Sequence, residues 1–323
     1  MGTFNIPDQR LYNQCISNHR FKKLEEVVQW LGAVQAQDYL GSLWAIGLRL
    51  KNARETHIEK AIADKKIVRS WPMRGTLHFV AAEDLRWMLK LLTPRVIQRS
   101  AGLYKELQLD NRVFGKSRKT VTTALRDGKQ FTRSEIYAVM ERSGISTHDQ
   151  RGLHILGHLA QEGLICFGPR NGKQQTFVLL DEWIPPAKMP DREQAIEKLT
   201  RSYFNSHGPA TVKDFAWWSG LAFTDAKNGI EGIKSGLSKQ ILDGETYWSA
   251  HESRRSNSSN NVFLLPSYDE YLVAYKDRNA AIDPKFIEKV KQSGNGIFAS
   301  PVIIGGRIAG VWKRSFTKDG VSV

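Results

Sequence analysis

Apolar residues recur at helical spacing along the first part of the chain. One amphipathic helix is predicted over 20–34, where apolar positions follow an i, i+3, i+4, i+7 pattern: Leu24, Val27, Val28, Leu31 and Val34. Similar patterns predict helices over 8–17, 38–50, 57–65 and 82–99. Residues 67–80 instead predict a β-hairpin that turns near Pro72. The first 110 residues therefore indicate several helices and one hairpin.

The next stretch has the most complete pattern. Residues 128–145 predict a helix-turn-helix, and residues 147–183 predict a further amphipathic helix followed by two strands around 169–172. A helical trio with a β-hairpin is the winged-helix arrangement. Such a unit usually binds nucleic acid.

The remainder begins with a third version of this pattern. A long helix over 192–205, a short helix capped by Thr211, a helix over 224–235 and strands over 238–250 are predicted in turn. Residues 251–261 are polar and predict a surface loop, 262–266 predict a buried strand, and 301–314 predict a hairpin turning at Gly305–Gly306.

These patterns predict an α+β chain of three tandem winged-helix modules with a β-rich C-terminal part. The expected boundaries are 1–110 for the first module, which holds the candidate catalytic motif, 111–189 for the second, 190–250 for the third and 251–323 for the last part.

Charge sharpens the expectation of a nucleic-acid partner. The 323 residues are 41% hydrophobic and 25% charged, which is typical of a globular protein, and 47 basic against 33 acidic residues give a net charge of +14. The excess lies in 1–110 (+6), 111–189 (+5) and 251–323 (+4), whereas 190–250 carries −1. This positive charge would neutralise the phosphates of double-stranded DNA, and residues 190–250 would serve mainly as scaffold. A merely basic protein is the alternative.

Several function classes lack sequence support. No run approaches the roughly 18 apolar residues of a membrane span, and the N-terminal residues do not resemble a secretory signal. Cys15 and Cys166 lack zinc-ligand spacing, and no phosphate loop, HExxH or GxSxG motif is present. We expect a cytoplasmic, monomeric protein that needs no cofactor or metal.

The first candidate site lies where two predicted helices join. Gln35 and Gln37 are two positions apart, so inside one helix their side chains would diverge, but at a joint both can point into one space. Asp38 would then start the next helix. The alternative is that Asp38 is simply an N-cap and both glutamines are solvated.

The second candidate site is the hairpin at 67–80. Strand alternation predicts a polar face of Arg74, Thr76 and His78, with Leu77 and Phe79 on the other face. Together with Arg69 on the first strand, this face suits contact with DNA phosphate or sugar. A solvated wing with a satisfied histidine is the alternative.

The third candidate site is an acidic pair in a basic segment. Asp269 and Glu270 precede Asp277 and Arg278 in the stretch 267–278. The pair could stabilise a cation during a reaction, or could lock neighbouring arginines in salt bridges, which is the interpretation we favour. Arg278 is a further candidate for DNA contact.

Three motifs in this order resemble the winged-helix DNA glycosylases of the AlkZ/YcaQ-like family. They are VQAQDYLGSLWAIGLR (34–49), SWPMRGTLHFV with the following AAEDLRWML (70–89), and LLPSYDEYLVAYKDR (264–278), and the resemblance extends over about residues 8–316. It implies three tandem winged helices that form a C-shaped cradle around DNA. The family's catalytic signature is Gln, an apolar residue, then Gln or Asp, which falls on Gln35, Ala36 and Gln37. Ala36 is small for the middle position.

The resemblance implies a monofunctional DNA glycosylase that excises N-alkylated purines, with unhooking of interstrand crosslinks as an extension. A cationic purine leaves without a general acid, so two amide carbonyls could suffice to place water and face the sugar cation. A non-catalytic DNA-binding regulator is the main alternative, because winged helices serve in regulators more often than in enzymes. An RNA- or phosphate-binding scaffold is a third, although no aromatic stacking motif is evident.

Overall fold

The computed structural model describes residues 5–186, 188–250, 261–291, 299–317 and 320–323. Two compact units divide the chain: residues 1–55 with 196–323, and residues 56–195. The first expected module, 1–110, contributes residues to both units. The two compact units do not test the predicted division into four parts, which concerns local folds, so that division stays a prediction.

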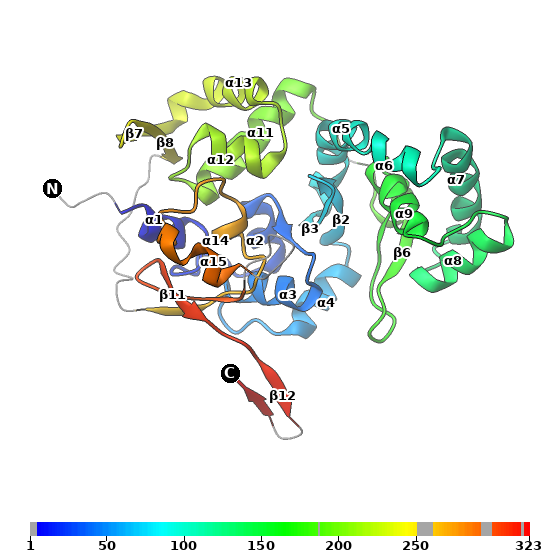
Figure 1. Cartoon of the computed structure of the whole chain (residues 1–323), viewed down its shortest axis with the longest axis horizontal. Helices are drawn as coiled ribbons and strands as arrows, with labels where there is room; N and C mark the ends of the chain where they lie inside the picture. The colour runs from blue at the N-terminus through cyan, green and yellow to red at the C-terminus, as the bar shows by residue number, and fades with distance from the viewer. Residues whose placement is uncertain (1–4, 187, 251–260, 292–298, 318–319) are drawn as a thin grey trace. The chain divides into compact units, whose positions relative to one another are not determined.

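The first unit begins with helices and continues with further helices from the middle of the chain (Figure 1). The Thr211 hydroxyl caps α12, since it accepts the Asp214 N–H at 3.1 Å while the Asp214 carboxylate accepts the Thr211 N–H at 3.0 Å, which confirms the predicted cap. The helical elements and the short strand among them are α1 (Ile6–Asn13), α2 (Leu24–Leu31), β1 (Val34–Gln35), α3 (Tyr39–Gly47), α11 (Arg192–His207, most of which lies in this unit), α12 (Val212–Ser219), α13 (Phe223–Ile233), η1 (Lys234–Gly236), α14 (Glu270–Val273), η2 (Pro284–Phe286) and α15 (Ile287–Val290).

Small antiparallel sheets complete the first unit. A hairpin joins β7 (Leu237–Leu242) to β8 (Glu245–Ala250), and a three-stranded sheet has the order β11 (Arg307–Val311), β10 (Pro301–Ile304), β9 (Val262–Leu264). A last hairpin pairs β12 (Ser315–Thr317) with β13 (Gly320–Ser322).

The structure tests three of the expectations for this region. Gly305 and Gly306 both have positive φ, of 55° and 76°, so the predicted turn is confirmed. The strand predicted at 262–266 is confirmed over Val262–Leu264, but its predicted burial is wrong there, because β9 lies at the sheet edge and Val262 is 58% exposed; the following Leu265 is fully buried. The loop predicted at 251–261 falls almost wholly outside the described residues.

The second unit contains helices together with a β-hairpin and a three-stranded sheet (Figure 1). Its core is a cluster of buried aliphatic and aromatic side chains that includes Trp71, Phe167 and Phe177. The elements are α4 (Glu55–Ala63), β2 (Ile67–Met73), β3 (Thr76–Ala81), α5 (Ala82–Arg99), α6 (Ala101–Glu106), α7 (Asn111–Leu125), β4 (Phe131–Thr132), α8 (Arg133–Arg142), α9 (Arg151–Gln161), β5 (Ile165–Phe167), β6 (Thr176–Leu179) and α10 (Leu180–Trp183). The hairpin is β2–β3, and the three-stranded sheet has the order β4–β6–β5.

Two sequence expectations in this unit need correction. The β2–β3 hairpin turns at Arg74–Gly75, with φ values of 57° and 73°, and not near Pro72. Pro72 instead lies within β2 where the pairing register shifts, because its ring nitrogen cannot donate to a strand ladder. Residues 128–145 hold one helix, α8, preceded by the short strand β4. The next helix, α9, begins at Arg151, beyond this stretch, so residues 128–145 do not contain the two predicted helices.

A buried ion pair fastens the first unit together. Arg49 and Asp269 are both fully buried, and the guanidinium donates to the two carboxylate oxygens at 2.8 and 2.9 Å although the residues are 220 positions apart. Arg49 also donates to the backbone oxygens of Gln14 and Ala45. Burial by itself would lower the pKa of Arg49, but the Asp269 carboxylate outweighs burial and raises it.

Removing one partner of this pair should destabilise the fold strongly. Asp269→Asn leaves the Arg49 guanidinium buried without its counter-charge, so we expect a loss of about 3–5 kcal/mol in the free energy of unfolding, measured by denaturant titration. Glu288→Gln is the matched control, because Glu288 forms an exposed ion pair with Lys291 and should cost less than about 1 kcal/mol. Equal losses in the two variants would contradict the structural role of the buried pair.

Candidate active site

The two candidate glutamines lie on a short segment between α2 and α3. Helix α2 ends at Gly32, whose φ of 77° lies in the left-handed region, and a Cβ there would come within 2.8 Å of Ser202 Oγ. Glycine is therefore required for the turn into β1. Gln35 closes β1, and Asp38 occupies the N-cap position of α3.

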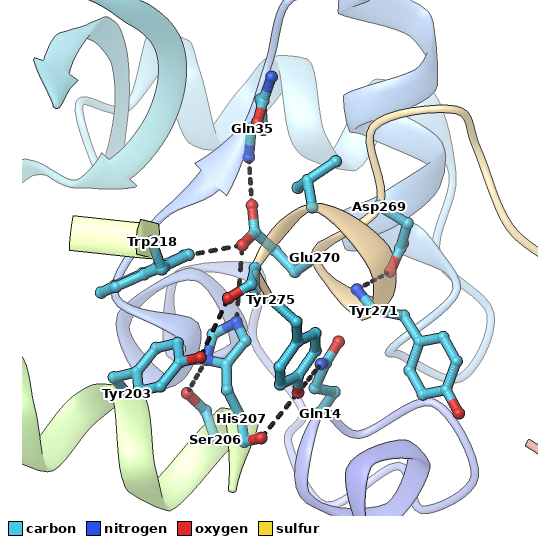
Figure 2. Close-up of polar contacts among 12 residues, drawn as sticks. Gln14, Gln35, Tyr203, Ser206, His207, Trp218, Asp269, Glu270, Tyr271 and Tyr275 are labelled. Carbon is cyan, nitrogen blue, oxygen red and sulfur yellow. Dashed lines mark hydrogen bonds and ion pairs between the residues drawn. The ribbon is translucent and has the colours of Figure 1, made fainter. Parts of the chain in front are cut away.

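The segment is buried on one side and open on the other. Gln35 is 8% exposed and Ala36 is fully buried, whereas Gln37 and Asp38 are exposed. The backbone N–H of Gln35 donates to Glu270 Oε1 at 2.8 Å, and the side chain of Gln35 extends away from that carboxylate (Figure 2). The main chain at Gln35 is therefore tied to the protein interior, while Gln37 faces outward.

Glu270 is a fully buried carboxylate with several partners. Its Oε2 accepts the Trp218 indole N–H at 2.9 Å and lies 3.6 Å from His207 Nε2 (Figure 2). Burial lowers the pKa of His207, and the nearby Glu270 carboxylate only opposes this effect, so the imidazole favours its neutral form. Two N–H donors thus stabilise the Glu270 charge.

A second layer of hydrogen bonds holds the groups around Glu270. Tyr275 donates its hydroxyl proton to the backbone oxygen of His207 at 2.7 Å, and Gln14 Nε2 donates to Tyr275 Oη at 2.9 Å. Tyr203 donates to the backbone oxygen of Ala274 at 3.0 Å. These contacts link α1, α11 and α14 and leave Glu270 little freedom to move.

Asp38 occupies the N-cap position without acting as a side-chain cap. Its backbone oxygen accepts the Ser42 N–H at 2.9 Å, but its carboxylate makes no capping hydrogen bond to the helix. The carboxylate instead lies over Gly41, where a Cβ would come within 2.4 Å of Oδ2. Burial chiefly raises the pKa of Tyr268, and the negative charge of Asp38 adds to this effect.

The acidic pair separates into two roles. Asp269 forms the salt bridge with Arg49, as the favoured interpretation of the sequence required, whereas Glu270 meets Gln35, Trp218 and His207. Both carboxylates are fully buried. Of the candidate site residues in the first unit, the structure therefore brings Gln35 and Glu270 into direct contact.

Arg278, the candidate DNA contact in this unit, is partly buried. Its Nε donates to the backbone oxygen of Leu272 at 2.9 Å, and its guanidinium lies 5.8 Å from the centre of the Trp217 ring. Burial lowers its pKa. The Arg278 side chain thus stabilises the end of α14. A contact with DNA would have to be made by the same, partly buried side chain.

In the second unit, Arg69 lines a cavity of about 400 Å³ together with Trp71 and Phe177. It is 6% exposed, its Nη1 donates to Gln175 Oε1 at 3.2 Å, and its guanidinium lies 4.7 Å from the centre of the Phe167 ring. These contacts make Arg69 part of the packed interior more than of the outer surface.

The predicted polar face of the hairpin is not a solvated face. His78 is fully buried, with Nδ1 3.0 Å from the backbone oxygen of Thr76 and Nε2 3.3 Å from Arg74 Nη2. Every residue of β2 is buried as well, so alternation does not separate a dry face from a wet one. Arg74 and Thr76 are partly buried and lie near the turn, and Leu77 packs against the core only partly buried.

Sequence reasoning missed the residues that support the site. Arg49, His207 and Trp218 are fully buried partners of the acidic pair, and none of them stood out in its own stretch of sequence. One signal was available: Arg49 follows the apolar helix 39–47, where a charge needs a buried partner. Nothing in the sequence indicated which acid that partner would be.

Neither the two cysteines nor the other metal-ligating side chains of the described residues form a metal site. Cys15 and Cys166 are buried, and burial raises the pKa of both thiols. Among the described residues, no three His, Cys, Asp or Glu side chains gather in a way that could hold a metal ion. Across the same residues, no helix combines the length and apolarity that crossing a membrane requires.

The fold matches that of a solved DNA glycosylase. The structure of Streptomyces sahachiroi DNA glycosylase AlkZ superposes with a TM-score of 0.80 at 21% identity, covering 98% of this chain and 88% of that one. At this identity the likeness establishes the fold. It is a mixed helical fold with small antiparallel sheets.

Sequence comparison identifies the family. Residues 28–323 match the family described as DNA glycosylase AlkZ-like. The interstrand DNA cross-link repair glycosylase of Streptomyces sahachiroi is 24% identical, over 94% of this chain and 85% of that protein. The chain belongs to the AlkZ-like DNA glycosylase family, which confirms the resemblance carried by its three motifs.

Glu270 and Trp218 should be energetically coupled through their hydrogen bond. Glu270→Gln leaves one acceptor oxygen for two donors, so either the Gln35 or the Trp218 N–H then faces an amide N–H₂. We expect Glu270→Gln to lower the free energy of unfolding of the parent protein by about 1–3 kcal/mol more than it lowers that of a Trp218→Phe variant. The Trp218→Phe variant lacks the indole donor, so it has no hydrogen bond to lose at this position. A double-mutant cycle by denaturant unfolding measures the difference. Additivity within about 0.5 kcal/mol would contradict the coupling.

Proposed function

We propose that this protein hydrolyses the N-glycosidic bond of N-alkylated purines in double-stranded DNA, with Gln35 and Gln37 as the catalytic residues. The observation that carries the proposal is the contact of the Gln35 backbone with the buried Glu270, at 2.8 Å, next to an exposed Gln37. A fixed main chain with an outward-facing amide favours precise placement of a substrate or a water molecule.

The chemistry requires little more than placement. Alkylation at a ring nitrogen makes the purine cationic, so when the bond between C1′ and the base nitrogen breaks, the electron pair leaves with the base and neutralises it. The sugar becomes an oxocarbenium ion, water adds to C1′, and the released proton passes to solvent. Amide carbonyl oxygens can accept hydrogen bonds from that water and direct partial negative charge at the sugar cation.

The carboxylates have supporting roles in this proposal. Glu270 is a positioning residue, because it acts through the Gln35 backbone and is fully buried. Asp38 is exposed beside Gln37 and adds negative potential near the reacting sugar. Asp269 acts at one further remove, by holding Arg49.

Interstrand crosslinks form a natural extension of the substrate range. The relative from Streptomyces sahachiroi is named an interstrand DNA cross-link repair glycosylase, and a crosslink through a purine ring nitrogen presents the same cationic leaving group. The same hydrolysis at one end would release one strand.

We also propose that DNA is held by three winged-helix modules. The order helix, short strand, helix, helix and two strands occurs as α2–β1–α3–α4–β2–β3 and again as α7–β4–α8–α9–β5–β6. A third instance is α11, α12, α13, β7 and β8, where the backbone of Ala210 bridges to Trp248 in the place of the short strand. The sheet order β4–β6–β5 also suits a wing.

Loss of the Gln37 amide should remove activity without removing binding. Both glutamines are neutral, so their loss leaves the electrostatic attraction to DNA unchanged. We expect Gln37→Ala to lower single-turnover excision of N7-methylguanine by about 10²-fold or more, with Gln35→Ala affected likewise. Excision is measured as strand cleavage after alkaline treatment of the abasic site, and duplex affinity and unfolding are measured in parallel.

Two further variants sharpen this test. Gln130→Ala removes an exposed glutamine elsewhere and should leave excision at the parent rate. Gln37→Asp should retain activity on N7-methylguanine, because a carboxylate faces the sugar cation more directly. If Gln37→Ala excises at the parent rate, the glutamines are structural, and a non-catalytic DNA-binding role becomes the better interpretation.

The hairpin turn should contribute to binding through Arg74. Because Arg74 has a φ of 57°, alanine there would add backbone strain, whereas asparagine tolerates this conformation. We expect Arg74→Asn to weaken duplex binding about 3- to 10-fold at ~0.1 M salt, with the thermal midpoint nearly unchanged. Lys60→Ala, at an exposed lysine paired with Asp64, should change neither quantity. A change in stability without a change in affinity would assign Arg74 to the hairpin fold alone.

A further inference from the structure

A basic cleft lies in the first unit between α2 and α11. Its volume is about 670 Å³, and one wall comes from residues that lead into and form α2 while the other comes from α11. We call it the α2–α11 cleft. Five of the residues that line it are positively charged: Arg20, Lys22, Lys23, Lys198 and Arg201.

The lining of this cleft holds more cations than acids. Among the described residues that line it, Glu26 is the only carboxylate. That carboxylate accepts the backbone N–H groups of Lys22 at 3.3 Å and Lys23 at 3.1 Å, so it is oriented toward the start of α2. Five cationic side chains and one carboxylate therefore line the cleft, and that carboxylate is engaged as a helix cap.

The cleft is built on a fixed aromatic floor. Trp30 donates its indole N–H to the backbone oxygen of Asn13 at 2.7 Å, and Ser202 Oγ donates to the backbone oxygen of Trp30 at 3.2 Å, which joins the end of α2 to α11. The Arg20 guanidinium lies 4.4 Å from the centre of the Trp30 ring. This stacking orients a planar set of N–H donors at the cleft.

Helix α11 presents its two cations on its outer face. Lys198 and Arg201 are three residues apart and exposed, whereas Leu199, Tyr203 and Phe204 are buried on the opposite side. The segment 190–250 carries 7 basic and 8 acidic residues, and this balance predicted a scaffold with little role in phosphate neutralisation. The structure gathers two of its basic residues beside three from the N-terminal part, so a local cation cluster exists where the segment total is negative.

We propose that the α2–α11 cleft binds the phosphodiester backbone of the DNA substrate at a site additional to the glutamine segment. Spaced cations with a guanidinium held over an aromatic ring suit phosphate oxygens, which they neutralise without reading bases. Neither Gln35 nor Gln37 lines the cleft, so it contributes affinity and register rather than chemistry. The inference rests on the proposed function only in taking DNA as the polymer.

A charge-reversal pair tests the cleft. Lys198→Glu with Arg201→Glu should weaken binding to an undamaged duplex at least about 10-fold at ~0.1 M salt and reduce the slope of log affinity against log salt by about two. Lys285→Glu with Lys289→Glu is the control, since it makes the same charge change at exposed sites of the same unit that lie outside the three proposed modules and do not line the cleft. Its affinity should stay within about twofold of the parent. Lys22→Gln with Lys23→Gln, on the opposite wall, repeats the test should the first variant fail to fold.

Three readouts decide the outcome. Equal losses in the cleft and control variants, or no loss in either, would overturn the proposal. The affinities of the parent and the cleft variant are also measured for a single strand of the same sequence. A larger loss for the duplex assigns the cleft to paired backbone, and a larger loss for the single strand assigns it to unpaired backbone. Single-turnover excision at saturating enzyme should stay within about twofold in the cleft variant. The binding result therefore stands even if no glycosylase activity is found.

Discussion

The structure of the first unit depends on how it accommodates two adjacent buried carboxylates. A buried charge is costly unless donors and counter-charges surround it. Asp269 meets this requirement with the Arg49 guanidinium, and Glu270 meets it with the N–H groups of Trp218 and Gln35. The same contacts that stabilise the charges therefore join α3, α12, α14 and the glutamine segment into one arrangement. The proposed catalytic residue Gln35 is fixed because Glu270 needs its backbone N–H.

Local features of this fold could be predicted because their causes are local. A pair of glycines sets the β10–β11 turn, and a Thr–Asp capping box starts α12, and both are visible in a few neighbouring residues. The position of Gln35 between two helices was also visible, because the apolar pattern breaks there. The partner of Asp269 was not, since Arg49 lies 220 residues away and no local pattern specifies which of the chain's arginines a carboxylate will meet.

Alternation and segment charge share one restriction, because both are read along the chain and not in space. Alternation identifies a wet face only when one side of a hairpin is open to solvent, and here β2 is buried throughout and His78 with it. Net charge counted along the sequence likewise ignores which side chains share a surface. Residues 190–250 sum to a negative value, yet the exposed face of α11 places Lys198 and Arg201 among other cations. In both cases the three-dimensional neighbourhood decides what the one-dimensional pattern leaves open.

The division between buried charge and exposed amide suits a protein whose substrate is a polyanion. A carboxylate on the DNA-facing surface is repelled by phosphates, most strongly at low salt, and of the carboxylates discussed at this site only Asp38 is exposed. Glu270 avoids this because it is fully buried and engaged by two N–H donors, while the outward position beside it is held by the neutral Gln37. A neutral amide is too weak a base to activate water for an unmodified nucleoside. If the proposed function holds, the selectivity for alkylated purines then follows from the leaving group, because only a base that already carries positive charge departs without a proton donor.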